Sequence, residues 1–160
     1  MSNMTTAAIS EIHLETHIED SPDRVWQALT DDIGAWWPAE FYAGGEPDSR
    51  SYHLEAEPGG RMYEQWADGG LLWGTVSTVA PGTRLQIVGA TFPDWGGPSM
   101  SFSTWELEAD DEGTVLRFSL STMGRISEAD AAEKEKGWRF LLAGTLKAYV
   151  EGTPPPQWED

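Results

Sequence analysis

The sequence predicts an α+β protein in which a curved antiparallel sheet of about six or seven strands wraps around a long C-terminal helix, with two short helices after the first strand. The first observation is a series of short alternating runs between residues 51 and 123, separated by glycine-rich turns at 58–60 and 68–70. Such spacing is typical of antiparallel hairpins in a meander. The second is a capping-box pattern at Ser127, followed by helical periodicity to about Val150.

The chain begins with one strand and two short helices. Residues 12–18 alternate apolar and polar side chains, which is the period of a half-buried strand. Ser21 followed by Pro22 supplies an N-cap and a proline at the first helical position, so a short helix starts there. A second short helix over residues 33–37 is expected to end at Pro38.

The sheet then continues through six further runs, and one long helix covers it. The expected strands are 52–54, 62–66, 73–79, 85–88, 99–108 and 114–123. The helix presents one apolar face, made by Trp138, Leu141, Leu142, Thr145, Leu146 and Tyr149. Residues 152–156 include three prolines, cannot continue the helix, and are expected to be extended and solvated.

Length and composition limit the partners of the protein. With 160 residues and no cysteine, the chain is expected to form one domain with an ordered core of about residues 9–151 and no disulfide. Its 27 acidic and 10 basic side chains give a net charge of -17, which disfavours nucleic acids and anionic membranes. Without a secretion signal or an apolar run of the roughly 18 residues that membrane insertion needs, a cytoplasmic location is expected. Monomer and homodimer both remain open.

Several stretches of the sequence resemble bacterial proteins related to the activator of heat shock protein 90 ATPase. They are SPDRVWQALT at 21–30, WWP at 36–38, PGGR at 58–61, GTV at 74–76, PGTRL at 81–85, Gly113-Thr114, Gly137-Trp138 and Leu146. The resemblance implies that residues 1–160 form a single domain of the SRPBCC or START-like superfamily, with its Bet v-like helix-grip fold. It also implies a hydrophobic cavity between sheet and helix, which different members use for lipids, polyketides, hormones or co-chaperone contacts.

One carboxylate is expected on the inner face of the sheet. If Trp105 and Phe118 point inward, strand alternation places Ser103 on the same face and gives Met62 and Glu64 that orientation on an earlier strand. A carboxylate on an apolar face is a candidate acid or base, or a partner for a polar ligand group. Alternatively, a register shift turns Glu64 to solvent and Tyr63 inward, or an arginine, Arg61 or Arg84, pairs with it.

The high tryptophan content, nine in 160 residues, favours an aromatic-lined pocket. Ordinary core packing explains any single ring, whereas Trp95 lies in a flexible loop, 92–98, from which it is expected to cover the cavity mouth. The residues expected to bind a ligand are Trp37, Met62, Glu64, Trp66, Trp73, Trp95, Ser103, Trp105, Phe118, Trp138 and Leu142.

Motifs for unaided catalysis are missing from the sequence. It contains no nucleophile elbow, phosphate-binding glycine loop or calcium loop, and the acidic turn 110–113 is a hairpin turn. His13 and His17 lie roughly 13 Å apart along one strand, too far to share a metal ion. No metal and no cofactor are therefore expected.

The leading interpretation is a binding protein for a small hydrophobic or aromatic molecule, lipid-like or polyketide-like, held between sheet and helix. A first alternative is a cyclase-like or isomerase-like enzyme that uses Glu64 as acid or base in the same cavity. A second is a co-chaperone-like interaction module with a chaperone partner. No counterpart of the N-terminal domain with which the eukaryotic activator engages its chaperone is expected, which disfavours this second alternative.

Overall fold

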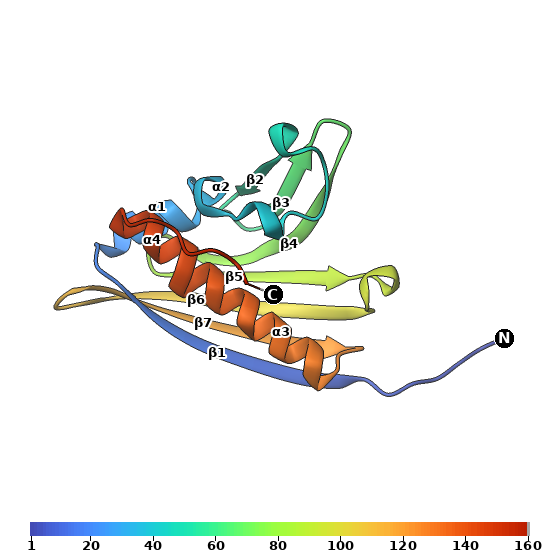
Figure 1. Ribbon diagram of the computed structural model, residues 1–160. Helices are drawn as coiled ribbons and strands as arrows, with labels where there is room; N and C mark the ends of the chain where they lie inside the picture. Colours follow the sequence, from blue (N-terminus) through green and yellow to red (C-terminus); the bar gives the residue numbers. More distant parts are fainter. Residues whose placement is uncertain (160) are drawn as a thin grey trace.

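The protein is built on one antiparallel sheet of seven strands, which the computed structural model describes within residues 1–159. The strands follow the order β1-β7-β6-β5-β4-β3-β2. The sheet curves around the C-terminal helix, which lies across its concave face (Figure 1). The expected α+β helix-grip fold, with two short helices after the first strand, is confirmed. None of the helices in the described residues has both the length and the apolar character required to cross a bilayer.

The elements begin and end close to the signals that predict them. Ser21 caps α1 by accepting the N–H of Arg24, and Ser127 forms a reciprocal capping box with Asp130. The strands are β1 (Ala8–Ile18), β2 (Ser51–Leu54), β3 (Arg61–Trp66), β4 (Gly69–Ala80), β5 (Arg84–Thr91), β6 (Ser99–Asp110) and β7 (Gly113–Gly124). The helices are α1 (Pro22–Leu29), α2 (Ile33–Trp36), α3 (Glu128–Arg139), the π-helix η4 (Phe140–Leu146) and α4 (Lys147–Glu151), with 3₁₀ turns η1 (Ala39–Phe41), η2 (Pro47–Ser49) and η3 (Pro93–Trp95).

The core lies between the concave face of the sheet and the continuous C-terminal helix formed by α3, η4 and α4. A row of buried side chains crosses four neighbouring strands through Leu14, Phe118, Trp105 and Leu85. Leu142 and Leu146 of η4 belong to the same core cluster and are almost completely buried. Each such side chain stabilises the fold by about 1.5–3 kcal/mol through removal from water. The helix is therefore held mainly by its apolar face, as its periodicity predicts.

Aromatic rings fill much of the space under the helix. The Trp138 ring lies 5.5 Å from Trp105 and 4.7 Å from Phe118, measured between ring centroids. Nearer to α2, Trp37 stacks on Tyr52 with 4.0 Å between centroids. Pairs in such arrangements contribute about 0.5–1.5 kcal/mol beyond their burial. Much of the tryptophan content is thus used to pack the interior.

One carboxylate lies inside this aromatic region. Glu64 of β3 is fully buried. Its Oε1 accepts the backbone N–H groups of Ala43 and Gly44 at 2.7 and 3.1 Å, and its Oε2 accepts the indole N–H of Trp73 at 2.8 Å. Hydrogen bonds to an ionised acceptor are roughly twice as strong as neutral ones. Glu64 therefore ties the loop that follows η1 to strands β3 and β4.

The negative charge of Glu64 acts on two neighbouring tyrosines. Burial, reinforced by Glu64 and then by Tyr42, raises the pKa of Tyr52 well above its ordinary value. Burial and Glu64 also raise the pKa of Tyr42, while Arg50 acts in the opposite direction. The hydroxyl of Tyr52 is buried without a hydrogen-bond partner among the described residues. Both hydroxyls are consequently harder to ionise than a tyrosine in water, and that of Tyr52 is the more strongly affected.

Replacing Glu64 with Gln should destabilise the protein. The amide retains one acceptor oxygen and places an NH₂ group against an N–H donor, so the free energy of unfolding should fall by about 2–4 kcal/mol. Urea unfolding followed by tryptophan fluorescence measures this loss. Glu57→Gln, which changes the charge equally at an exposed position, is the control and should be nearly neutral. Equal stabilities of the two variants would show that the three hydrogen bonds do not support the fold.

Replacing Tyr52 with Phe should cost nothing at neutral pH and should help at alkaline pH. Removing an unpartnered buried hydroxyl should leave the free energy of unfolding unchanged or raise it by up to about 1 kcal/mol. A pKa that is raised in the folded state stabilises it below the ordinary value, and this contribution is lost as the pH rises through the folded value. Above about pH 10 the native protein should therefore lose stability faster than Tyr52→Phe. Unfolding curves across this range test the difference, and a variant destabilised at neutral pH would contradict it.

Candidate functional site

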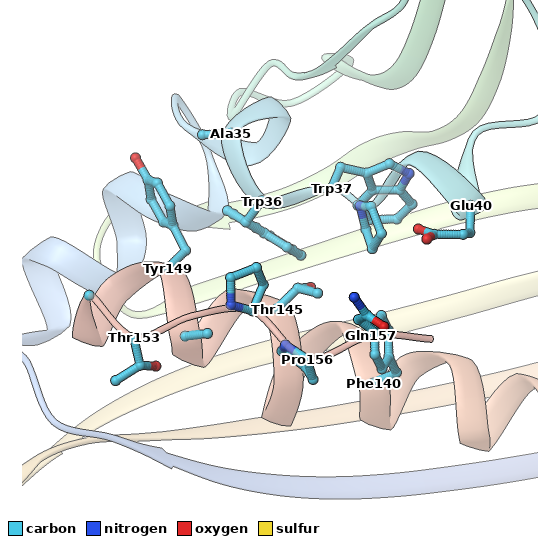
Figure 2. Close-up of a pocket in the computed structure, with 14 residues that line it drawn as sticks. Ala35, Trp36, Trp37, Glu40, Phe140, Thr145, Tyr149, Thr153, Pro156 and Gln157 are labelled. Atoms are coloured by element: carbon cyan, nitrogen blue, oxygen red, sulfur yellow. The ribbon is translucent and has the colours of Figure 1, made fainter. Parts of the chain in front are cut away.

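A cavity of about 560 Å³ opens between α2, the C-terminal helix and the segment that follows the helix. Figure 2 shows this arrangement, with aromatic side chains of α2 and of the helix facing a common space. We call residues 152–159 the return segment. The wall comprises Ala35, Trp36, Trp37, Pro38 and Glu40, then Phe140, Thr145, Ala148 and Tyr149, and finally Gly152, Thr153, Pro155, Pro156 and Gln157 of the return segment.

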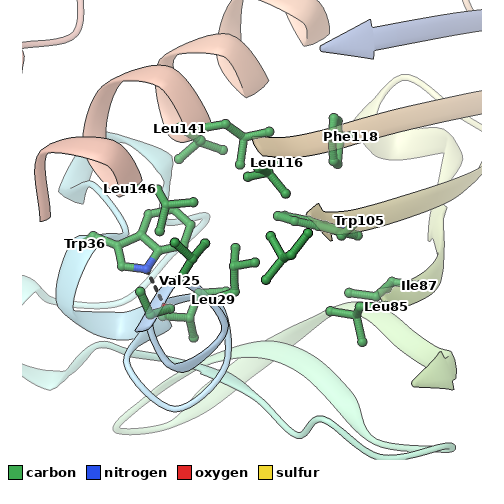
Figure 3. Close-up of a cluster of buried hydrophobic side chains, with 14 of the residues drawn as sticks. Val25, Leu29, Trp36, Leu85, Ile87, Trp105, Leu116, Phe118, Leu141 and Leu146 are labelled. Carbon is green, nitrogen blue, oxygen red and sulfur yellow. Dashed lines mark hydrogen bonds between the residues drawn. The ribbon is translucent and has the colours of Figure 1, made fainter. Parts of the chain in front are cut away.

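The aromatic walls are fixed by contacts outside the cavity. The indole N–H of Trp36 donates to the carbonyl of Ala28 in α1 at 2.7 Å (Figure 3). The hydroxyl of Tyr149 donates to Asp32 at 3.1 Å, and the guanidinium of Arg24 binds the same carboxylate at 3.3 Å. Each of these two side chains is fixed by its backbone at one end and by a hydrogen bond at the other. Neither the Trp36 ring nor the Tyr149 ring can rotate into the cavity without breaking its hydrogen bond. The two hydrogen-bonded walls are therefore preformed.

The helix changes geometry where it borders the cavity. Residues 140–146 form a π-helix, a rare conformation that is frequent at functional sites. Along it Phe140 and Thr145 contribute to the cavity wall, whereas Leu142 and Leu146 pack into the core. The hydroxyl of Thr145 is satisfied by the carbonyl of Leu141 at 3.1 Å. One side of the π-helix η4 therefore packs into the core, and the other side lines the cavity.

The return segment is extended, as expected, but it folds back along the helix instead of projecting into solvent (Figure 1). Gly152 starts the reversal with a left-handed φ of 74°. Gly144 lets it pass closely, because a Cβ at that position would lie 3.0 Å from Pro156 Cγ. Trp158 then packs edge-on against Phe41 and Phe140, at 5.0 and 5.1 Å between centroids. Residues 152–156 are exposed, as expected, but the sequence did not predict that Trp158 anchors the segment beyond the prolines.

The charge carried by the described cavity wall is negative. Glu40 is exposed at its edge, and Figure 2 shows its carboxylate directed toward the space between Trp37 and Phe140. No hydrogen bond or ion pair joins Glu40 to another residue in the described part of the chain. No lysine, arginine or histidine belongs to the wall. Lys136 of α3 instead lies over the Trp158 ring, 4.7 Å from its centroid.

Among the residues expected to bind a ligand, Trp37 belongs to the cavity wall and the other ten do not. Met62, Glu64, Ser103, Trp105, Phe118 and Leu142 are buried in the interior, where Figure 3 shows Trp105 and Phe118 among the core side chains. Trp66, Trp73 and Trp138 are half-buried. Glu64 does point inward, so the register in which Tyr63 would replace it does not occur. Its carboxylate is occupied by the three protein donors described above.

Trp95 lies at the tip of the β5–β6 hairpin and is 55% exposed. It contributes to neither this cavity nor a shallower hollow of about 330 Å³ near the same hairpin. That hollow includes Phe92, Met100 and Met123, which are exposed apolar side chains. Within residues 1–159, no group of three or more histidine, aspartate or glutamate side chains is placed to hold a metal ion.

The sequence interpretation missed most of the cavity wall. Trp36 and Tyr149 were recognised as apolar helix positions, but nothing in their periodicity shows that they face each other across a gap. Glu40 and the return segment carried no signal other than the proline run. The Trp-Trp-Pro sequence at 36–38 contains two of the rings of this wall, but it gave no sign of a cavity, because both rings also belong to the buried core cluster.

Solved structures of low sequence identity share the fold. An uncharacterised protein from Rhizobium leguminosarum is 22% identical, with a TM-score of 0.70 over 92% of this chain and 97% of its own. CalU16 from Micromonospora echinospora is 20% identical, with a TM-score of 0.61 over 96% and 88%. Ara h 8.0201 is 12% identical, with a TM-score of 0.66 over 91% and 100%. At these identities the similarity shows the fold alone.

Sequence comparison gives the family directly. None of the curated proteins is significantly similar to this chain in sequence. The family model described as activator of Hsp90 ATPase homolog 1-like protein matches residues 20–151, from α1 through the end of the C-terminal helix. The chain therefore belongs to this family, within the SRPBCC superfamily.

Proposed function

We propose that the protein binds a small, mainly apolar or aromatic molecule in the cavity between α2 and the C-terminal helix. The observation that carries this proposal is the preformed aromatic wall: Trp36 and Tyr149 are each fixed by hydrogen bonds outside the cavity. A volume of about 560 Å³ lies within the range of small-molecule sites, about 300–1,000 Å³. The SRPBCC fold, which is commonly used for ligand binding, supports the same assignment.

The proposal assigns binding and no reaction. Glu64, the sequence candidate for an acid or base, is fully buried, and both of its oxygens accept hydrogen bonds from the protein. It is also not part of the cavity wall. A bound molecule in this cavity would instead meet aromatic faces, prolines and a few polar groups, which is a surface that recognises shape more than it transfers protons.

Filling the cavity should abolish binding. Ala35 of α2 is exposed and lines the cavity, so Ala35→Trp places a large ring in it at little cost to folding. Native mass spectrometry of freshly purified protein, beside a denatured control, should show a co-purified small molecule on the native protein and none on this variant. Ala132→Trp, exposed on α3 outside the wall, is the matched control and should keep the added mass. Retention by Ala35→Trp, or a clean apo mass with no thermal shift across lipid and aromatic libraries, would overturn the proposal.

Releasing the return segment should accelerate exchange of the bound molecule. Trp158→Ala removes the ring packed edge-on against Phe41 and Phe140, so the segment should detach more often and the dissociation rate should rise severalfold. Stopped-flow displacement by a fluorescent hydrophobic dye measures this rate. Trp95→Ala removes an exposed tryptophan from the β5–β6 tip and serves as the matched control. A faster rate in Trp95→Ala than in Trp158→Ala would show that the hairpin, and not the return segment, covers the site.

A further inference from the structure

The polar groups of the cavity wall are unevenly distributed between donors and acceptors. The indole N–H of Trp36 and the hydroxyls of Tyr149 and Thr145 already donate to other protein atoms. The indole N–H of Trp37 is shielded from solvent and has no hydrogen-bond partner among the described residues. The wall has further polar side chains at Thr153 and Gln157 but contains no basic side chain. A ligand carboxylate or phosphate would therefore lose hydration without meeting a compensating positive charge.

A positively charged ligand group would meet favourable partners at this cavity. Glu40 supplies a carboxylate without an ion-pair partner in the described residues, directed toward the cavity between Trp37 and Phe140 (Figure 2). The faces of tryptophan and tyrosine rings attract cations, by an amount that grows as the cation is desolvated. Lys136, the nearby cation on α3, is placed over the Trp158 ring and does not belong to the wall. Glu40 is thus available as a counter-charge.

The protein as a whole adds to this preference. Its net charge of -17 produces a negative potential that raises the local concentration of cations and lowers that of anions. This field falls off within about 10 Å at moderate salt, so it favours the approach of any cation without choosing a site. The choice of site comes from Glu40 and the rings beside it.

We propose that the ligand of this cavity is an organic cation: an aromatic or apolar body that carries a protonated amine, with Glu40 as the counter-charge. This inference rests on the proposed function and narrows it to one chemical class. The body of the ligand lies among Trp36, Phe140 and Tyr149, and its amine lies at the edge of the cavity near Glu40. Neutral molecules of the same shape bind more weakly, and the corresponding acids bind most weakly.

The test uses three probes with the same ring system: naphthylmethylamine, naphthylmethanol and naphthoic acid. Isothermal titration calorimetry of the full chain should give an affinity for the amine about 3–10-fold above that for the alcohol, with the acid weakest. Glu40→Gln should remove most of the difference between amine and alcohol by weakening the affinity for the amine. Glu46→Gln, an exposed position outside the wall, matches the charge change and should preserve the difference.

The outcomes separate the two proposals. If the alcohol or the acid binds as tightly as the amine, the cavity is a ligand site and the assignment to organic cations is wrong. If Glu46→Gln reduces the preference as much as Glu40→Gln does, the preference arises from the overall field and the role of Glu40 is overturned. If none of the probes binds the native protein, while hydrophobic dyes also fail, the proposed function itself falls and this inference falls with it.

Discussion

The buried carboxylate of Glu64 is the interaction on which the arrangement of the site depends. It holds the backbone of Ala43 and Gly44 against β3 and β4, and those two residues directly follow η1 and Tyr42. Since η1 carries both Glu40 and Phe41, the same tether fixes one edge of the cavity and one of the rings that receive Trp158. A charge buried in the sheet thus positions an exposed charge on a loop.

The aromatic content explains where the open space lies. The rings of Trp105, Phe118 and Trp138 pack together beneath α3, so the middle of the space between sheet and helix is occupied. The cavity opens toward α2, where Trp36 and Tyr149 are held by groups of α1 and of the turn after it. In this protein, the rings that fill the interior occupy the space under α3, and the hydrogen-bonded rings beside α2 border the cavity.

Periodicity was sufficient for the fold and insufficient for the site. Alternation in β1, β6 and β7 and the capping box at Ser127 predicted the strands and the helix, because these depend on local geometry. Alternation left two orientations open for Glu64, of which the inward one occurs. They could not predict the partners of Glu64, since its three donors come from positions as far as 21 residues away in the chain. The π-helix and the docking of Trp158 likewise depend on tertiary contacts that leave no periodic trace.

One wall of the cavity comes from a segment outside both sheet and helix, so that wall can vary independently of the core. Consecutive prolines restrict the backbone before it docks, so the segment loses little conformational entropy on folding back. Residues such as Pro155 and Gln157 line the cavity, yet they are exposed and take no part in the core. Substitutions there can change the size and polarity of the cavity at almost no cost in stability. The wall of the cavity can therefore change while the folded scaffold stays the same.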